Sequence, residues 1–417
     1  MTPGKNTRAK QVHLPSRNRR SYRSALLFLA AASGVFFVIY VSLLHPGRDR
    51  ATQNTQVSLD GVALSLDSTT QRGWLARAQA VSRKFHGVYT PCWEGAYGAM
   101  GDALLFSSSH DSSLLRFHLV DNPLQRMCEG TWVDDRAWVC LAELMWWRVT
   151  GGTDMGLVMD AVKRYQEARR QGRFSRHEGF WSWYNWPPGA NVGERIFTNT
   201  SMNQMVTVAC RLYEATANKR FLKDALLAWN GDKRHPGIEK TWYLGDGRWS
   251  GRPGQAAFGK ELPWEGTGYC SVAAALYRVT GETRYRDIAV QTAKRILDPA
   301  TGWVDSEDYY QLRMDGSGAF VHFLLDAYDI APDALADIPG KIEKMLQHVW
   351  TNNHGAAIVT LHRAEDHGIR NGWNPRGGEE GYGVGEIGTL HAQGEAARAF
   401  GTFVYYRFHY RSAGNLD

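Results

Sequence analysis

The sequence predicts an all-α fold, an (α/α)6 barrel of six helical hairpins preceded by a single transmembrane helix. Three observations lead to this prediction. One uninterrupted apolar run lies near the N-terminus, an aromatic-x-x-Thr pattern recurs along the rest of the chain, and few segments show the two-residue alternation typical of strands. The 417 residues are enough for two ordinary domains or one large helical barrel.

The first element is a basic tail at residues 1–23. It contains seven Lys or Arg residues and no acidic residue. Without this tail, the formal net charge of +6 falls to near neutral. The high isoelectric point is therefore not the footprint of a nucleic-acid-binding protein.

The second element is the uncharged segment 24–44, SALLFLAAASGVFFVIYVSLL. About 20 residues at 1.5 Å rise cross an apolar layer of about 30 Å, so we predict a transmembrane signal anchor. A buried core helix would have a polar face, and a cleaved signal peptide would have a shorter apolar region followed by a small-x-small site. The preceding positive charges place the N-terminus in the cytoplasm. We therefore expect a single-pass type II membrane protein whose main domain faces a secretory lumen, the cell surface or a periplasm.

Residues 45–71 are polar without a sustained period and are predicted to be a stalk. Residues 72–412 contain no Pro-, Gly- or Ser-rich linker and are predicted to be one domain. Within it, Thr150, Thr216 and Thr280 are spaced by roughly 65 residues in the related segments WWRVTGG, LYEATANKRFLKDA and LYRVTGETRYRDIA. Such a spacing indicates a supersecondary repeat.

Each copy of the repeat has the pattern of an αα-hairpin. An amphipathic helix ends at Thr, and Gly151 or Gly281 can take the left-handed position after it. A short polar turn follows, and Phe221 or Tyr285 begins the next apolar face. About 340 residues at about 57 per hairpin give six hairpins, enough to close a ring of twelve helices. An open solenoid of the same hairpins would give the same sequence pattern.

The segment EGTWVDDRAWVCLAELMWW carries the candidate chemistry. Asp134 and Asp135 stand directly before an apolar helix face, so one of them is expected at the N-cap or in the first turn. Asp is also a favoured cap without any catalytic role. Carboxyls on neighbouring residues suit the separation of about 5 Å found in a retaining glycosidase better than the wider inverting spacing. The helix N-terminus favours one ionised carboxylate, whereas mutual repulsion favours a proton on the other.

The segment WVDDRAWVCLAELMWWRVTGG closely resembles the catalytic segment of glycoside hydrolase family 76, the α-1,6-mannanases and their fungal wall-acting relatives. The resemblance extends over about residues 85–410, through the Leu-Tyr-x-x-Thr-Gly turns, the GFWSW stretch at 179–183 and the helix near His391. It implies a six-hairpin glycosidase that acts on an α-linked mannose polymer. It also implies that Asp134 is the nucleophile and that Asp135 is the acid/base.

Two segments depart from the family pattern. Trp264-Glu265-Gly266 stands where the family has Tyr-Asn-Gln-Gly, and Gly316-Ser317-Gly318 stands where it has Phe-Lys-Gly. Both segments lie on the substrate side in the family. The chemistry can thus be kept while the sugar, the linkage or the acceptor differs.

The C–H face of a pyranose stacks on aromatic rings, so several Trp residues are candidate sugar platforms, although each can equally be a core residue. Asn199 is a candidate hydroxyl ligand, but it also begins the glycosylation pattern Asn199-Thr200-Ser201. Glu265 is either a third acid of the cleft or a surface residue beside a turn. The candidate platforms are Trp132, Trp181, Trp183 and Trp264.

The five Cys residues are too scattered for a disulfide scaffold and form no CxxC pair; one bridge, from Cys92 to Cys128, is conceivable. The His residues are dispersed without an HExxH motif, so we expect neither a metal nor another cofactor. The expected partners are an oligosaccharide or polysaccharide and the membrane. Two alternatives stay open: a transglycosylase that remodels cell-wall or surface glycans at the same site, and a catalytically silent carbohydrate-binding protein.

Overall fold

The computed structural model describes residues 71–128, 133–170, 174–175, 180–181, 199–249, 263–308, 316–352, 362–364, 368–370 and 389–409. The predicted tail and transmembrane helix, and all but the last residue of the predicted stalk, lie outside these ranges. Within the ranges, no helix is both long and apolar enough to cross a membrane. Residues from Ser65 onward form one compact unit, and its first described helix begins at Gln71.

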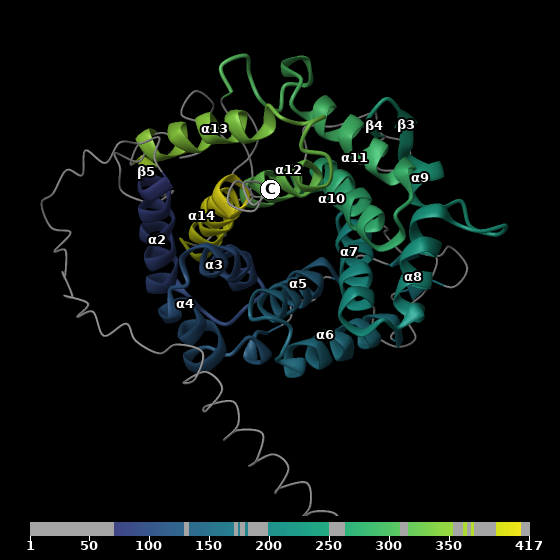
Figure 1. The fold of residues 1–417 in the computed structure, drawn as a ribbon, viewed down its shortest axis with the longest axis horizontal. Helices are drawn as coiled ribbons and strands as arrows, with labels where there is room; N and C mark the ends of the chain where they lie inside the picture. The colour runs from purple at the N-terminus through teal and green to yellow at the C-terminus, as the bar shows by residue number, and fades with distance from the viewer. Residues whose placement is uncertain are drawn as a thin grey trace, which may run out of the picture. The chain divides into compact units, whose positions relative to one another are not determined.

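An inner layer of helices forms a closed ring (Figure 1). Each inner helix packs on the next, and the last one packs on the first. The predicted six-hairpin architecture is therefore confirmed for this unit, and the open solenoid is excluded. The inner helices are α3 (Gly95–Ser109), α5 (Val133–Val149), α7 (Asn199–Thr216), α10 (Pro263–Thr280), α12 (Ser317–Ile330) and α14 (Thr389–Val404).

An outer layer covers the ring. The N-terminal helix α2 packs on the C-terminal helix α14, so the two ends of the domain together supply one hairpin. The outer partner of α3 is the short helix α4, which continues as the π-helical turn η1. The outer elements are α2 (Gln71–Val88), α4 (Ser112–Arg116), η1 (Phe117–Asp121), α6 (Met155–Ala168), α8 (Lys219–Asn230), α11 (Thr283–Ile296) and α13 (Ile338–Asn352).

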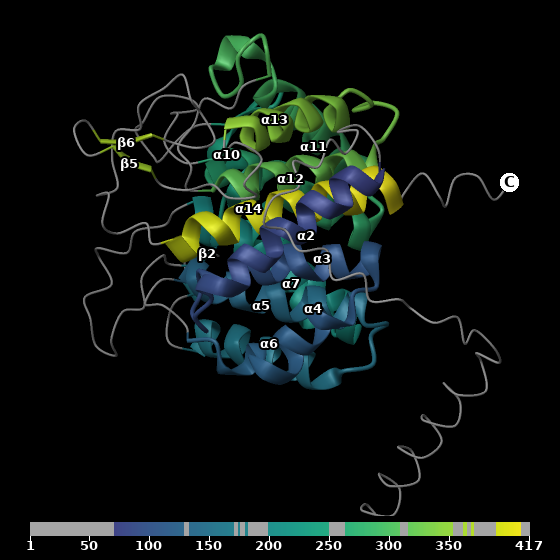
Figure 2. The ribbon, with the colours of Figure 1, turned by 90° about the vertical axis from the view of Figure 1, so that its left-hand side faces the viewer.

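Outside the two layers, the described residues contain short helical segments and three antiparallel strand pairs, β1–β2, β3–β4 and β5–β6. In Figure 2, β2 and the β5–β6 hairpin lie at the same end of the barrel. These elements are η2 (Leu124–Arg126), β1 (Phe174–Ser175), β2 (Phe180–Trp181), α9 (Gly237–Trp242), β3 (Tyr243–Gly245), β4 (Arg248–Trp249), η5 (Pro299–Thr301), β5 (His362–Ala364), β6 (Gly368–Arg370) and η6 (Tyr405–His409).

The repeated Thr residues end three inner helices in the same way. The hydroxyls of Thr150, Thr216 and Thr280 donate to the carbonyl four residues upstream, at 2.8, 2.6 and 2.7 Å. Gly151 and Gly281 follow with φ of +79° and +71°, the left-handed conformation that the sequence predicted. The repeated residues therefore terminate the inner helices in addition to contributing to helix packing.

The inner helices α3 and α14 approach each other backbone to backbone. A Cβ atom on Gly101 would lie 2.2 Å from the carbonyl oxygen of Ala397, and one on Gly401 would lie 2.2 Å from the carbonyl oxygen of Gly101. Real Cβ atoms do not come so close to another heavy atom. Glycine at these positions therefore fixes the distance at which the last inner helix closes onto the first.

Substitution of Gly101 by Ala is expected to lower the free energy of unfolding by about 1–3 kcal/mol, because the two backbones must separate to admit the methyl group. The matched control is Gly340→Ala in α13, where an added Cβ would meet nothing within 4 Å. That change should be neutral or stabilise by up to about 1 kcal/mol. Urea unfolding of both variants provides the measurement, and equal stability would contradict the close packing of α3 on α14.

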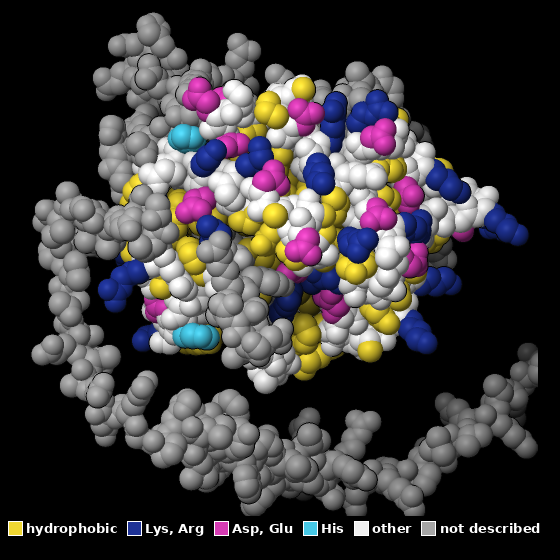
Figure 3. Space-filling view, turned by 45° about the horizontal axis from the view of Figure 1, so that its top comes forward, with side chains coloured by type: hydrophobic (Ala, Val, Ile, Leu, Met, Phe, Trp, Pro, Cys, Tyr) yellow, Lys and Arg dark blue, Asp and Glu magenta, His cyan; other side chains and the backbone are white. Residues whose placement is uncertain are grey.

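The distribution of charged side chains on the surface agrees with the near-neutral net charge expected for the domain. On the face shown in Figure 3, Lys and Arg side chains are interspersed with Asp and Glu side chains. A continuous basic stripe, as expected for a nucleic-acid-binding surface, does not occur among the described residues of this face.

Candidate active site

The tandem aspartates lie in the first turn of inner helix α5, which begins at Val133. Asp135 is buried, with 4% of its surface exposed, whereas Asp134 is partly exposed. The first turn of a helix carries partial positive charge and stabilises a carboxylate. The two neighbouring acids therefore have different environments, which is the condition for giving them different protonation roles.

An aromatic wall extends from this turn to the neighbouring helices. Trp138, one turn further along α5, meets Tyr97 of α3 edge-on with ring centroids 5.3 Å apart. Tyr97 in turn meets His391 of α14 edge-on at 5.2 Å, and Trp93 lies edge-on to both Tyr97 and His391. The N-terminal parts of α3, α5 and α14 are thus joined by edge-on contacts between aromatic rings.

The same wall holds a third acid, which the sequence analysis did not identify. Glu94 precedes α3, and its Oε1 lies 3.8 Å from Nδ1 of His391. The hydrogen bond from His391 lowers the pKa of Glu94, against the opposing effect of partial burial. The two residues come from opposite ends of the domain, so no local motif could have paired them.

Beneath the wall, a buried ionic layer fixes the first turn of α12. The carboxylate of Glu395 accepts the backbone N–H groups of Gly316 and Ala319 at 3.0 and 3.1 Å. The guanidinium of Arg398 lies 4.7 Å from the ring of Trp138, and its Nε donates to Nδ1 of His322 at 3.1 Å. Burial lowers the pKa of Arg398 to about 10, although the charge of Glu395 opposes this shift. These contacts therefore connect α12 and α14 to each other and to α5.

No family model matches the chain, and neither does any curated protein. Solved structures do match. A family 76 mannosidase from Bacteroides thetaiotaomicron VPI-5482 has a TM-score of 0.58 at 16% identity and covers 81% of this chain and 100% of its own. The GH76A alpha-1,6-mannanase from Salegentibacter sp. HEL1_6 has a TM-score of 0.53 at 16% identity and covers 80% of this chain and 99% of its own.

The chain has the fold of glycoside hydrolase family 76. A third match, Dfg5 from Chaetomium thermophilum in complex with glucosamine, has a TM-score of 0.58 at 13% identity and covers 82% of this chain and 92% of its own. An inactive Salegentibacter variant with two neighbouring aspartates substituted is described in complex with alpha-1,6-mannotetrose.

The segment Gly316-Ser317-Gly318 leads into α12 at a close contact with α14. Gly316 takes a left-handed φ of 84° before α12, and a Cβ on Gly318, the position where the family pattern also has Gly, would lie 2.3 Å from the Glu395 carbonyl oxygen. Small residues therefore allow α12 to begin directly against α14. A larger side chain at Gly318 would push the first turn of α12 away from Glu395.

The other predicted site residues are only partly located. Trp132 and Trp183 lie outside the described residues. For Trp181, Asn199, Trp264 and Glu265 the structure gives the backbone alone, in β2, at the start of α7 and in the first turn of α10. A Cβ on Gly268 would lie 2.8 Å from the side chain of Asn203, so the second turns of α10 and α7 adjoin. The roles of these six predicted residues as sugar ligands stay predictions.

The bridge considered between Cys92 and Cys128 is not formed. The backbone N–H of Cys128 donates to the Pro91 carbonyl at 2.9 Å, so the two segments adjoin, but both thiols are free. The Cys92 thiol instead lies 3.6 Å from Glu94. As expected for small buried hydrophobes, the remaining cysteines are fully buried: Cys140, Cys210 and Cys270.

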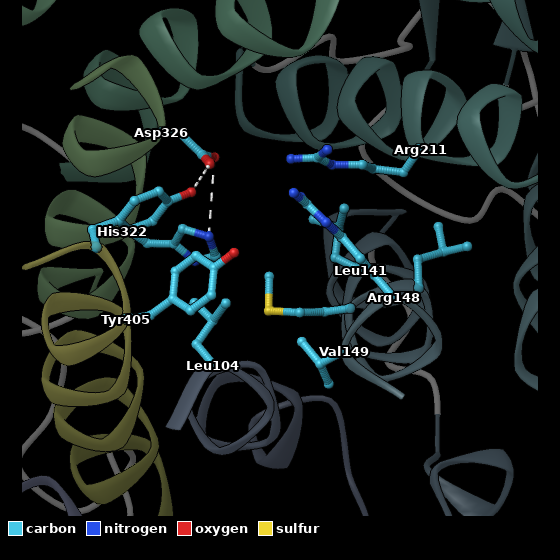
Figure 4. A pocket seen from close by; sticks show the side chains of 11 residues that line it. Leu104, Leu141, Arg148, Val149, Arg211, His322, Asp326 and Tyr405 are labelled. Atoms are coloured by element: carbon cyan, nitrogen blue, oxygen red, sulfur yellow. Dashed lines mark hydrogen bonds and ion pairs between the residues drawn. The ribbon is translucent and has the colours of Figure 1, made fainter. Parts of the chain in front are cut away.

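A small hollow lies between the C-terminal parts of several inner helices, far along α5 from its first turn (Figure 4). Arg148 of α5 and Arg211 of α7 point into it toward Asp326 and His322 of α12. Its volume of about 50 Å³ is small beside the about 300–1,000 Å³ of a ligand pocket. The space suits a few water molecules rather than a sugar ring.

Proposed function

We propose that the protein is a retaining glycoside hydrolase that cleaves α-linked mannan, with α-1,6-mannosidic bonds as its substrate. The observation that carries this proposal is the placement of Asp134 and Asp135 in the first turn of an inner helix of a family 76 fold. The similar structures named as mannosidase and mannanase support the substrate class. The inactive variant with two neighbouring aspartates substituted supports the choice of residues.

In the proposed reaction, the Asp134 carboxylate attacks the anomeric carbon while Asp135 gives its proton to the departing glycosidic oxygen. The bond to the leaving sugar breaks as the bond to Asp134 forms. Asp135, now ionised, takes a proton from water, whose oxygen attacks the same carbon and frees Asp134. Two inversions leave the anomeric configuration unchanged.

The substrate assignment is tested by incubating the purified full-length protein with α-1,6-, α-1,2- and α-1,3-linked mannans and separating the products by size. Shortening of the α-1,6 polymer supports the proposal. Cleavage of only an α-1,2- or α-1,3-linked mannan would show that the protein acts on that linkage instead. A glycosyl-enzyme can also be attacked by a sugar hydroxyl. Products longer than the starting oligosaccharide would therefore assign transglycosylation to the same site.

For the aromatic candidates, Trp181→Ala and Trp264→Ala are expected to raise KM about ten-fold or more with a smaller effect on kcat, because a stacked ring contributes mainly uniform binding. Trp350→Ala is the comparison, since this ring lies beside Phe400 and Arg77, away from the aspartate turn. Steady-state kinetics on an α-1,6-mannooligosaccharide separate the two parameters. A variant at 181 or 264 that unfolds would indicate a packing role for that Trp.

We also propose that the domain lies outside the cytoplasm, tethered by the apolar segment 24–44. The support is the charge asymmetry around that segment. In sealed vesicles with the lumen intact, added protease should leave the domain whole. Its digestion under those conditions would reverse the proposed orientation.

A further inference from the structure

Three side chains that bind transition metals converge between the first two long helices of the domain. They are His86 in the last turn of α2, Asp102 in the middle of α3 and His118 in η1. The Nε2 atoms of His86 and His118 lie 2.7 and 2.8 Å from the same oxygen, Oδ2 of Asp102. One donor atom from each of the three residues lies within 4.8 Å of the other two.

The two imidazoles satisfy only one of the two carboxylate oxygens of Asp102. Both imidazoles point at Oδ2, whereas Oδ1 of the same carboxylate is buried and has no hydrogen-bond partner. Asp102 and His118 are fully buried, and within the described residues no Lys or Arg forms an ion pair with Asp102. A buried carboxylate without a permanent positive charge beside it is unfavourable. A cation at the point of convergence would remove this cost.

We propose that His86, Asp102 and His118 form a binding site for one divalent zinc-like ion. Zinc binds His nitrogen at about 2.0–2.1 Å and Asp oxygen at about 2.0–2.2 Å, and tetrahedral geometry then separates the ligand atoms by about 3.3 Å. The present separations of 2.7 and 2.8 Å are shorter by about 0.5 Å. Small outward movements of the two imidazoles therefore suffice to admit the ion.

The donor set selects the class of metal. Two imidazoles and one carboxylate suit zinc, whereas magnesium and calcium prefer oxygen ligands throughout. The fourth position is left for a water molecule. The hydroxyl of Tyr89 is available to bind that water, since it is buried without a hydrogen-bond partner and its ring lies edge-on to His118 at 5.9 Å.

The site lies at a junction of the barrel. Its ligands connect the outer helix α2, the inner helix α3 and the turn η1, and α2 is also the outer partner of α14. The ring of His86 stacks on Phe117 with centroids 3.6 Å apart, which fixes the orientation of this partly exposed ligand. A bound ion would therefore link α2, the outer partner of α14, to α3 and η1, a structural role distinct from glycoside cleavage.

The test uses purified full-length protein from which metal has been removed with a chelator. Calorimetric titration with zinc chloride is expected to show about one strong site per chain, and zinc should raise the Tm. Cobalt(II) should bind in its place and give the visible absorption of a tetrahedral nitrogen and oxygen site. Wild-type protein that binds neither ion stoichiometrically would overturn the proposal without recourse to any variant.

The zinc affinities of single-residue variants show whether these three side chains bind the ion. His86→Gln and Asp102→Asn should each weaken zinc binding by more than the about 10- to 100-fold typical for loss of a group that only orients a ligand. The matched control is His235→Gln, which alters another buried His that pairs with a carboxylate, Asp232, at 2.8 Å, without a third ligand. It should keep wild-type affinity. Unchanged zinc affinity in a folded His86→Gln variant would show that the ion binds elsewhere and would overturn the assignment.

Discussion

Replacement of Asp134 by Asn is expected to lower turnover of every substrate by at least about four orders of magnitude, because no covalent glycosyl-enzyme can form. Asp135→Asn should behave differently. A dinitrophenyl glycoside needs little protonation of its leaving group, so the first step should survive and the intermediate should accumulate. Mass spectrometry of the intact protein should then detect the trapped glycosyl-enzyme in Asp135→Asn and not in Asp134→Asn.

Added azide distinguishes the two roles. In Asp135→Asn it should attack the accumulated intermediate and give a glycosyl azide of retained configuration. In Asp134→Asn any azide product should form in one step with inverted configuration. The reverse pattern would exchange the roles, and wild-type activity of Asp134→Asn would refute the mechanism.

A matched control tests whether loss of a helix-terminal acid has a general effect. Asp154 caps α6 by accepting the N–H of Gly156 at 2.9 Å, on the outer layer of the barrel. Asn is also a competent cap, so Asp154→Asn should keep wild-type activity and stability. The same reasoning predicts that both active-site variants remain folded, which circular dichroism can verify.

The hairpins were predictable from sequence because their signals are local. Each hairpin signal lies within a few residues. At Thr280, Gly281 and Tyr285, for example, a helix ends in Thr, a left-handed residue follows, and a buried aromatic residue lies in the first turn of the next helix. Ring closure was not determined by such signals. It depends on the packing of α14 against α2 and α3, and that contact requires Gly101 and Gly401, which in sequence look like ordinary helix interruptions.

In the candidate site, too, some residues could be predicted from local sequence patterns and others could not. Asp134 and Asp135 were identifiable because neighbouring acids at the start of an apolar helix form a local pattern. Glu94 and His391 become a pair only when α3 meets α14. The proposed metal ligands lie on three separate elements and are spaced 16 residues apart along the chain. Sequence reasoning that relied on motif spacing therefore predicted no metal, since neither HExxH nor CxxC occurs.

The buried network around Asp326 contributes to the stability of the barrel. Its carboxylate accepts the hydroxyls of Ser271 at 2.7 Å and Tyr406 at 2.9 Å, and it lies 3.5 Å from Nη2 of Arg278. Burial alone would raise the pKa of Asp326, but the charge of Arg278, with smaller contributions from other groups, holds it well below the usual range. The folded state therefore keeps this carboxylate ionised.

Removal of this carboxylate in Asp326→Ala is expected to lower the free energy of unfolding by about 3–5 kcal/mol, because the mostly buried Arg278 is left with less compensating charge. Asp326→Asn keeps the size of the side chain and should lower the free energy of unfolding by a smaller amount. Asp287→Ala, an exposed position on α11, serves as the control and should change stability by less than about 0.5 kcal/mol. Urea unfolding at pH 7 compares the three variants.

The pH dependence gives an independent check of the same network. A carboxylate with a depressed pKa in the folded state stabilises fully above its unfolded pKa of about 3.9, and this stabilisation is lost as the pH falls toward the folded pKa. The stability difference between wild type and Asp326→Asn should therefore be constant from about pH 7 to pH 5 and shrink below about pH 4. A difference that stayed constant down to pH 3 would show that the charge of Asp326 does not stabilise the barrel.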